Sequence, residues 1–123
     1  SWFDGVKPIQ TIETLYQEKA NKAQEAWITP TLLNGWVEST PIRYRKNEFG
    51  KVEFKGRVKS GTIDTPCLVL PSGYRPSVPR HFPVVSNNAS GYSFVDSAGA
   101  VVINNAAAKD VYVSLDTISF YAD

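Results

Sequence analysis

From Trp27 to the end of the chain, apolar residues recur at every second position, in short runs separated by Gly, Pro, Asn, Asp and Ser. A period of two is typical of half-buried β-strands, and this punctuation is typical of turns. The clearest case is residues 42–59, where Ile42 and Tyr44 begin one alternating stretch and Val52 begins another after a short polar turn. This region predicts an antiparallel hairpin with one solvent-facing side.

Further strands are predicted at residues 82–85, 92–95, 100–103 and 111–121, with a tight turn at residues 96–99. Within the last strand, the apolar parity changes between Leu115 and Ile118. The apolar residues before and after this change can all be buried only if the strand has a bulge or break near Asp116 and Thr117, which we therefore predict.

One apolar run, residues 67–70, does not alternate. It predicts a strand covered on both faces, with Cys67 as a small core residue, before a turn at residues 71–76. Many short antiparallel strands need stacked layers to hide their edges. We therefore expect residues 27–123 to form an all-β head domain, an antiparallel two-sheet sandwich of jelly-roll-like character.

Residues 1–26 differ in composition from the rest. From Pro8 to the end of this segment there is no Gly, and Glu, Lys, Gln and Ala dominate, which predicts a helix. A heptad register runs through Ile9, Ile12 and Tyr16, but Lys and Ala occupy its other core positions. Three interpretations stay open: a trimeric coiled-coil stem, a helix lying on its own domain, or a flexible stalk.

Composition excludes several classes of protein. The 123 residues include 13 Lys and Arg against 12 Asp and Glu, a net charge of +1, whereas a general nucleic-acid or membrane-surface binder needs an excess of basic residues. No apolar stretch approaches the roughly 20 residues of a spanning helix, so we expect no membrane insertion. The single Cys allows neither an intrachain disulfide nor a thiolate metal cluster. The lack of any Met leads us to expect a fragment of a longer protein.

The basic residues are unevenly distributed. One predicted hairpin holds seven of the 13: Arg43, Arg45, Lys46, Lys51, Lys55, Arg57 and Lys59. Two interpretations remain open: a solvated strand face, or contact with a polyanion or a negatively charged partner, helped by Tyr44 and Phe49. Interleaved Glu48 and Glu53 argue against nucleic acid.

Candidate catalytic groups are few. His81 is the only histidine, so a His–His metal pair is excluded and any Ser–His–acid triad would have to use this residue. No two carboxylates stand out as a glycosidase pair, and no Gly-rich phosphate loop leads from a strand into a helix. We expect no catalytic residues, no metal and no cofactor, and hence no enzyme.

The aromatic, Asn and Asp residues in and beside the predicted loops indicate ligand binding, not catalysis. Aromatic rings stack on the apolar faces of sugars, while Asn and Asp suit sugar hydroxyls. The candidate ligand-binding residues are His81, Asn87, Asn88, Tyr92 and Asp96. The competing interpretation is that these residues only form turns or lie at strand edges.

Four motifs in order resemble the C-terminal head domain of tail-tip proteins from phages of Gram-positive bacteria. They are the opening Asn34-Gly35-Trp36, the Gly-x-Val strand in residues 50–61, the Leu-Pro-Ser-Gly-Tyr-Arg-Pro turn at residues 70–76, and the closing strand at residues 112–120. The resemblance covers approximately residues 27–122.

The resemblance implies a homotrimeric β-sandwich head on a helical stem, at the virion tail tip, within a receptor-binding protein, tail fibre or baseplate component. Such a head would bind a bacterial cell-wall saccharide, for example teichoic acid, and its partners would include other tail or baseplate proteins. Weak sites suffice when several heads bind at once. Two alternatives remain: a baseplate adaptor that docks another tail protein, and a glycan depolymerase or its carbohydrate-binding appendage.

Overall fold

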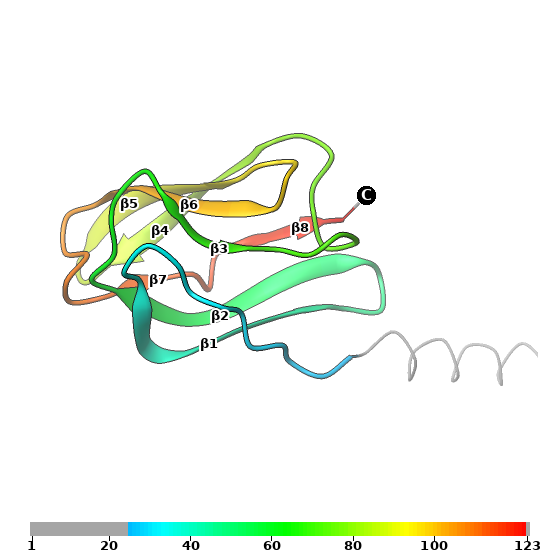
Figure 1. The fold of residues 1–123 in the computed structure, drawn as a ribbon, viewed down its shortest axis with the longest axis horizontal. Helices are drawn as coiled ribbons and strands as arrows, with labels where there is room; N and C mark the ends of the chain where they lie inside the picture. The colour runs from blue at the N-terminus through cyan, green and yellow to red at the C-terminus, as the bar shows by residue number, and fades with distance from the viewer. Residues whose placement is uncertain (1–24, 123) are drawn as a thin grey trace, which may run out of the picture.

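The structure is a computed structural model that describes residues 25–122 as strands, turns and loops (Figure 1). The strands are β1 (Val37–Lys46), β2 (Lys51–Lys59), β3 (Pro66–Val69), β4 (Arg80–Ser86), β5 (Ala89–Val95), β6 (Ala100–Ala106), β7 (Val113–Ser114) and β8 (Ser119–Tyr121). The helix predicted for residues 1–26 lies outside the described residues, apart from Glu25 and Ala26, which are in a loop. Among residues 25–122, no helix long and apolar enough to cross a membrane is found.

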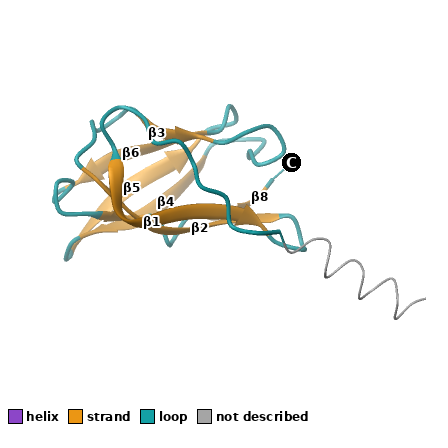
Figure 2. Ribbon diagram, turned by 60° about the horizontal axis from the view of Figure 1, so that its bottom comes forward, coloured by secondary structure: helices purple, strands orange, loops and turns teal. Residues whose placement is uncertain are grey.

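All strand pairs are antiparallel, and the sheet order is β1-β2-β7-β4-β5-β6-β3, with β8 also paired to β2. One layer contains β1, β2 and β8, and the other contains β4, β5, β6 and β3 (Figure 2). The short strand β7 joins the layers, because its Ser114 is opposite Arg57 of β2 and Val85 of β4. The predicted all-β antiparallel fold is confirmed, with its two layers continuous through β7 in one curled sheet.

The hairpin predicted from residues 42–59 is the pair β1 and β2. Its alternating apolar side chains are buried between the layers: Ile42, Tyr44, Val52, Phe54 and Val58. At the turn, Asn47 Oδ1 accepts hydrogen bonds from the N–H groups of Phe49 (2.9 Å) and Lys51 (3.0 Å). Gly50 supplies the left-handed φ of 83° that the turn requires.

The predicted break in the last strand is confirmed between β7 and β8, and both segments pair with β2. A turn at Asp116 and Thr117 shifts the parity, so that Leu115 and Ile118 are both fully buried. The break is held to β2 at Gly56, whose N–H donates to Asp116 Oδ1 (2.9 Å) and whose carbonyl accepts from the Leu115 N–H (3.0 Å).

The segment before β1 covers both edges of the sheet. Ile28 exchanges two backbone hydrogen bonds with Tyr44 on β1, at 2.7 and 3.0 Å. A few residues later, the Leu33 N–H donates to the carbonyl of Cys67 on β3 (2.9 Å). Exposed strand edges invite pairing with other chains, so this segment protects the sheet and closes it toward a barrel.

The strand β3 corrects one prediction. Cys67 and Leu68 are fully buried, as expected, but Val69 is 50% exposed. Consecutive burial of Cys67 and Leu68 comes from a register shift against β6 between Pro66 and Leu68, not from cover on both faces. The outer side of β3 therefore faces solvent.

Candidate functional site

The outer face of the β4–β5–β6 layer carries aromatic and polar side chains. On β4 and β5 the side chains of Val84 and Ser93 point into the core and are buried, whereas those of His81 and Tyr92 are exposed. Pairing of β4 with β5 places Pro83 opposite Tyr92 and His81 opposite Phe94, whose ring centroid lies 5.8 Å from that of His81. Two of the predicted ligand residues, His81 and Tyr92, thus share one surface.

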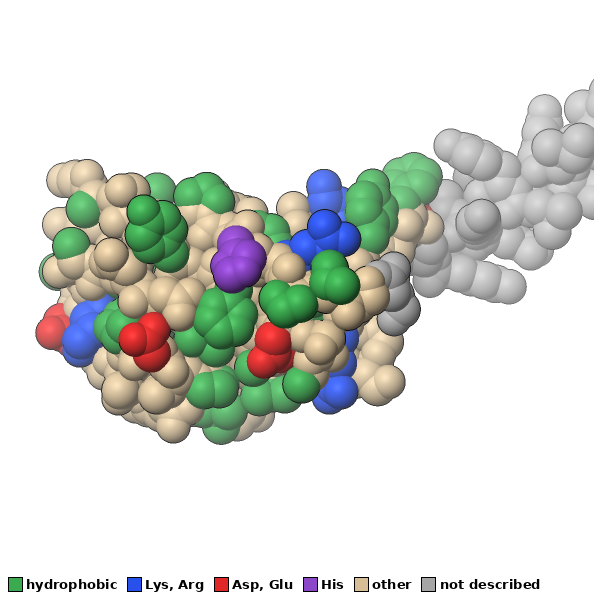
Figure 3. All heavy atoms as spheres, turned by 90° about the horizontal axis from the view of Figure 1, so that it is seen from above, with side chains coloured by type: hydrophobic (Ala, Val, Ile, Leu, Met, Phe, Trp, Pro, Cys, Tyr) green, Lys and Arg blue, Asp and Glu red, His purple; other side chains and the backbone are tan. Residues whose placement is uncertain are grey.

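An open depression of about 460 Å³ lies on this surface. It is lined by His81, Phe82, Pro83, Tyr92, Ser93 and Asn104. Tyr92 is 64% exposed and presents its ring to solvent. Figure 3 shows the single histidine in purple, with apolar side chains gathered around it and basic side chains to one side.

Asn104 reaches the depression because of a β-bulge. Tyr92 is opposite Asn105 and Ser93 is opposite Ile103, so Asn104 is the extra residue on β6. Its Nδ2 donates to Asp64 Oδ1 at 3.0 Å, which fixes the orientation of the amide. Bulges re-aim side chains and are common beside functional sites.

A second depression, of about 330 Å³, lies between β4 and β8. Its lining consists of Lys51, Arg80, His81, Phe82, Ser119, Phe120 and Tyr121. His81 and Phe82 line both depressions, so the two are contiguous. They form one surface, which we call the His81 groove.

The other predicted ligand residues lie elsewhere. Asn87 and Asn88 form the turn between β4 and β5, where Asn87 has a left-handed φ of 54° and its carbonyl accepts from the Tyr112 hydroxyl at 2.9 Å. Asp96 begins the turn at the opposite end of β5, and its Oδ1 accepts from the N–H groups of Ala98 (3.0 Å) and Ala100 (2.9 Å). A seven-residue strand is about 20 Å long, so the five candidates do not form one site.

Sequence reasoning missed Arg80 and Asn104, and it singled out Lys51 only as one of the basic residues of the hairpin. Lys51 and Arg80 are 29 positions apart and meet only because β8 lies beside β2. Asn104 did carry a signal: Asn104 and Asn105 are adjacent polar residues at the end of an apolar strand, which breaks the alternation where the bulge occurs.

The basic hairpin residues lie against aromatic rings. Arg45 Cζ and Lys55 Nζ are 4.2 and 4.3 Å from the ring centroid of Trp27, and Arg57 Cζ is 4.1 Å from that of Tyr112. Arg45 also pairs with Glu53 (2.9 Å). These contacts order the side chains while leaving their N–H groups at the surface. We call the surface formed by Arg45, Lys55 and Arg57 with Trp27 and Tyr112 the cationic face.

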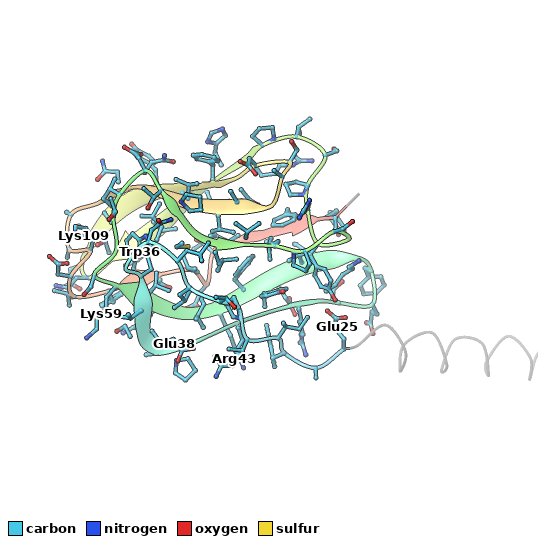
Figure 4. All side chains as sticks on the ribbon, in the orientation of Figure 1. Glu25, Trp36, Glu38, Arg43, Lys59 and Lys109 are labelled. Atoms are coloured by element: carbon cyan, nitrogen blue, oxygen red, sulfur yellow. The ribbon has the colours of Figure 1, made fainter. Side chains whose placement is uncertain are left out.

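Two carboxylates, those of Glu38 and Glu25, bind neighbouring groups in this layer. Glu38 Oε1 lies 2.7 Å from Arg43 Nη1, and this hydrogen bond lowers the pKa of the Glu38 carboxyl (Figure 4). Glu25 accepts hydrogen bonds from the Tyr74 hydroxyl (2.9 Å) and the Lys46 N–H (2.8 Å). Burial, reinforced by Glu25, raises the pKa of Tyr74 to about 12.

The single thiol of the chain is buried. Burial raises the pKa of the Cys67 thiol to about 12, so this side chain is a protonated core residue at neutral pH. Among residues 25–122, no group of three or more His, Cys, Asp or Glu side chains is placed to hold a metal ion. Exposed aromatic and amide groups in an open depression suit a polar ligand with apolar faces.

No protein-family model matches the chain, and no curated protein sequence matches it. Among solved structures, the crystal structure of the receptor binding protein (gp15) of Listeria phage PSA is similar, with a TM-score of 0.72 and 24% sequence identity. The match covers 92% of this chain and 76% of that chain. The two proteins share a fold, which confirms at the level of the fold the resemblance to phage head domains.

Proposed function

We propose that this chain is the head domain of a phage receptor-binding protein, located at the virion tail tip, and that it binds a saccharide of the host cell wall. The observation that carries the proposal is the fold shared with a phage receptor binding protein over 92% of the chain. The motif order seen in the sequence supports the same assignment.

The His81 groove suits a saccharide. The exposed Tyr92 ring offers a surface for the C–H face of a sugar, while His81 and Asn104 offer polar groups for its hydroxyls. An open, shallow site of this kind gives modest affinity. Several heads acting together would convert it into firm attachment.

We also propose that binding is not followed by cleavage. Hydrolysis of a glycosidic bond normally needs two carboxyl groups flanking it. In the described part of the chain, residues 25–122, none of the side chains that line the two depressions is Asp or Glu. Wall polymer incubated with the chain should therefore keep its length.

A second candidate function is that of a baseplate adaptor that docks another tail protein. The cationic face favours it, because Trp, Tyr and Arg are enriched at protein interfaces and here lie together as Trp27, Tyr112, Arg45 and Arg57. An acidic partner surface would complement this face.

The proposal is tested by binding of the fluorescently labelled chain to a panel of Gram-positive cells and purified wall polymers, with free sugars as competitors. We expect saturable binding that one sugar abolishes. Tyr92→Ala should weaken it at least tenfold, as expected for a stacked aromatic anchor. Phe49→Ala is the matched control, because Phe49 is an aromatic residue, 75% exposed, at the β1–β2 turn.

Absence of binding to every surface, from a folded chain, would contradict receptor binding. Capture of a tail protein, lost when Arg45 and Arg57 are replaced by Gln, would then support the adaptor.

A further inference from the structure

The His81 groove has two chemically different halves. The half lined by Tyr92, Pro83 and Asn104 is aromatic and neutral. The half between β4 and β8 has an apolar floor, where the rings of Phe82 and Phe120 lie 6.4 Å apart. Lys51 and Arg80 add two positive charges to this second half.

The second half exists because the sheet opens between β4 and β8. The strand β7 pairs with β2 and with β4 at Val85, whereas β8 pairs with β2. No pairing of β8 with β4 is found within residues 25–122. Side chains from three strands (β2, β4 and β8) therefore surround the opening.

Lys51 and Arg80 are not neutralised in the described part of the chain. Its ion pairs are Arg43–Glu38, Arg45–Glu53 and Lys109–Asp110, and neither Lys51 nor Arg80 takes part. Lys51 Nζ instead lies 5.7 Å from the ring centroid of Tyr121, and Arg80 is exposed. Among residues 25–122, no acidic side chain lines this half of the groove.

We propose that the His81 groove selects a saccharide that carries an anionic group, with the sugar ring over Tyr92 and the anion between Lys51 and Arg80. The inference rests on the proposed function. It adds that the ligand is negatively charged and names the residues that bind the charged group. Guanidinium groups bind oxyanions through paired N–H donors, and an ammonium adds a point charge. A neutral sugar brings no anion to either cation, so it binds more weakly.

The test measures inhibition of polymer binding by three sugars: glucose 1-phosphate, glucuronate and glucose. If an anion is required, both charged sugars inhibit at lower concentration than glucose, and their order tells phosphate from carboxylate. Lys51→Gln and Arg80→Gln should each weaken the charged inhibitors about tenfold and leave glucose unchanged. Higher ionic strength should weaken only the charged inhibitors.

Lys59→Gln is the matched control, because it removes the same charge from β2 away from the groove. If Lys59→Gln weakened inhibition by the charged sugars as much as Lys51→Gln and Arg80→Gln do, the effect would be general attraction to the basic hairpin, and the anion site would be contradicted. Equal inhibition by charged and neutral sugars would also contradict it.

These failures differ from failure of the proposed function. Suppose that the wild-type chain binds polymer and Tyr92→Ala abolishes binding, while Lys51→Gln and Arg80→Gln change nothing. Receptor binding is then supported and the anion site is contradicted. If the wild-type chain binds no polymer, both proposals are contradicted. Urea unfolding curves of the three Gln variants confirm that each is folded.

Discussion

Trp36 packs against a glycine that has no room for a side chain. A Cβ on Gly61 would lie 2.0–2.2 Å from three atoms of the Trp36 indole, which is 2% exposed. The left-handed region is not involved here, so the requirement is one of space. Gly61→Ala should lower the free energy of unfolding by about 2 kcal/mol, measured by urea unfolding with tryptophan fluorescence.

The control is Gly50→Ala. Gly50 has a φ of 83° but nothing within 4 Å of a built Cβ, so this change adds only backbone strain of about 1 kcal/mol. Equal destabilisation by the two variants would contradict the packing explanation for Gly61.

Cys67 provides a probe of the core. Burial raises its pKa from 9.0 to about 12, so on raising the pH the unfolded chain loses its thiol proton first. The free energy of unfolding should therefore fall between about pH 9 and pH 12. Near neutral pH the thiol should react with Ellman's reagent only as the chain unfolds, and fully in urea. Fast reaction of the native chain would be incompatible with a buried Cys67.

At the scale of elements, the break between β7 and β8 depends on Asp116. Asp116→Ala leaves the Gly56 N–H without its acceptor, and we expect a loss of about 1 kcal/mol in the free energy of unfolding. Asp110→Ala, an exposed carboxylate on a loop, should change it by less than about 0.5 kcal/mol. Equal effects in chemical denaturation would show that Asp116 does not hold the break.

Strands were predictable where burial follows a period of two, as in the β1–β2 hairpin and at the parity change after Leu115. The covering of both sheet edges by the segment before β1 could not be predicted. The hydrogen bonds of Ile28 with Tyr44 and of Leu33 with Cys67 join distant parts of the chain. The prediction that both faces of residues 67–70 are covered was wrong at Val69 for the same reason. Which strand lies at the edge of the sheet depends on the topology, not on the local sequence pattern.

For the whole molecule, the site was predictable only in part. His81 and Tyr92 were predicted and share the groove, since both belong to one hairpin. Lys51 and Arg80 come from different strands, so nothing local in the sequence brings them together. Asn87, Asn88 and Asp96 lie in turns at either end of β5, and their part in binding stays a prediction.

The two ends of the described chain lie at the same end of the molecule, where Glu25 is hydrogen-bonded to Tyr74 (Figures 1 and 4). Lys59 and Lys109 lie at the opposite end (Figure 4). The stem predicted for residues 1–26 would leave that opposite end facing outward, and we expect three chains to associate through it. Light scattering of the full chain should give about three times the monomer mass of 13.6 kDa. A monomer at high concentration would contradict the trimer.

The most direct test of the central claim is a titration of the isotopically labelled full chain with a wall polymer of a bound host, followed by backbone amide NMR. Saccharide recognition by the His81 groove predicts shifts at Lys51, Arg80, His81, Tyr92 and Asn104, with the cationic face unchanged. Shifts confined to the cationic face around Trp27 and Arg57, or none at saturating polymer, would contradict it.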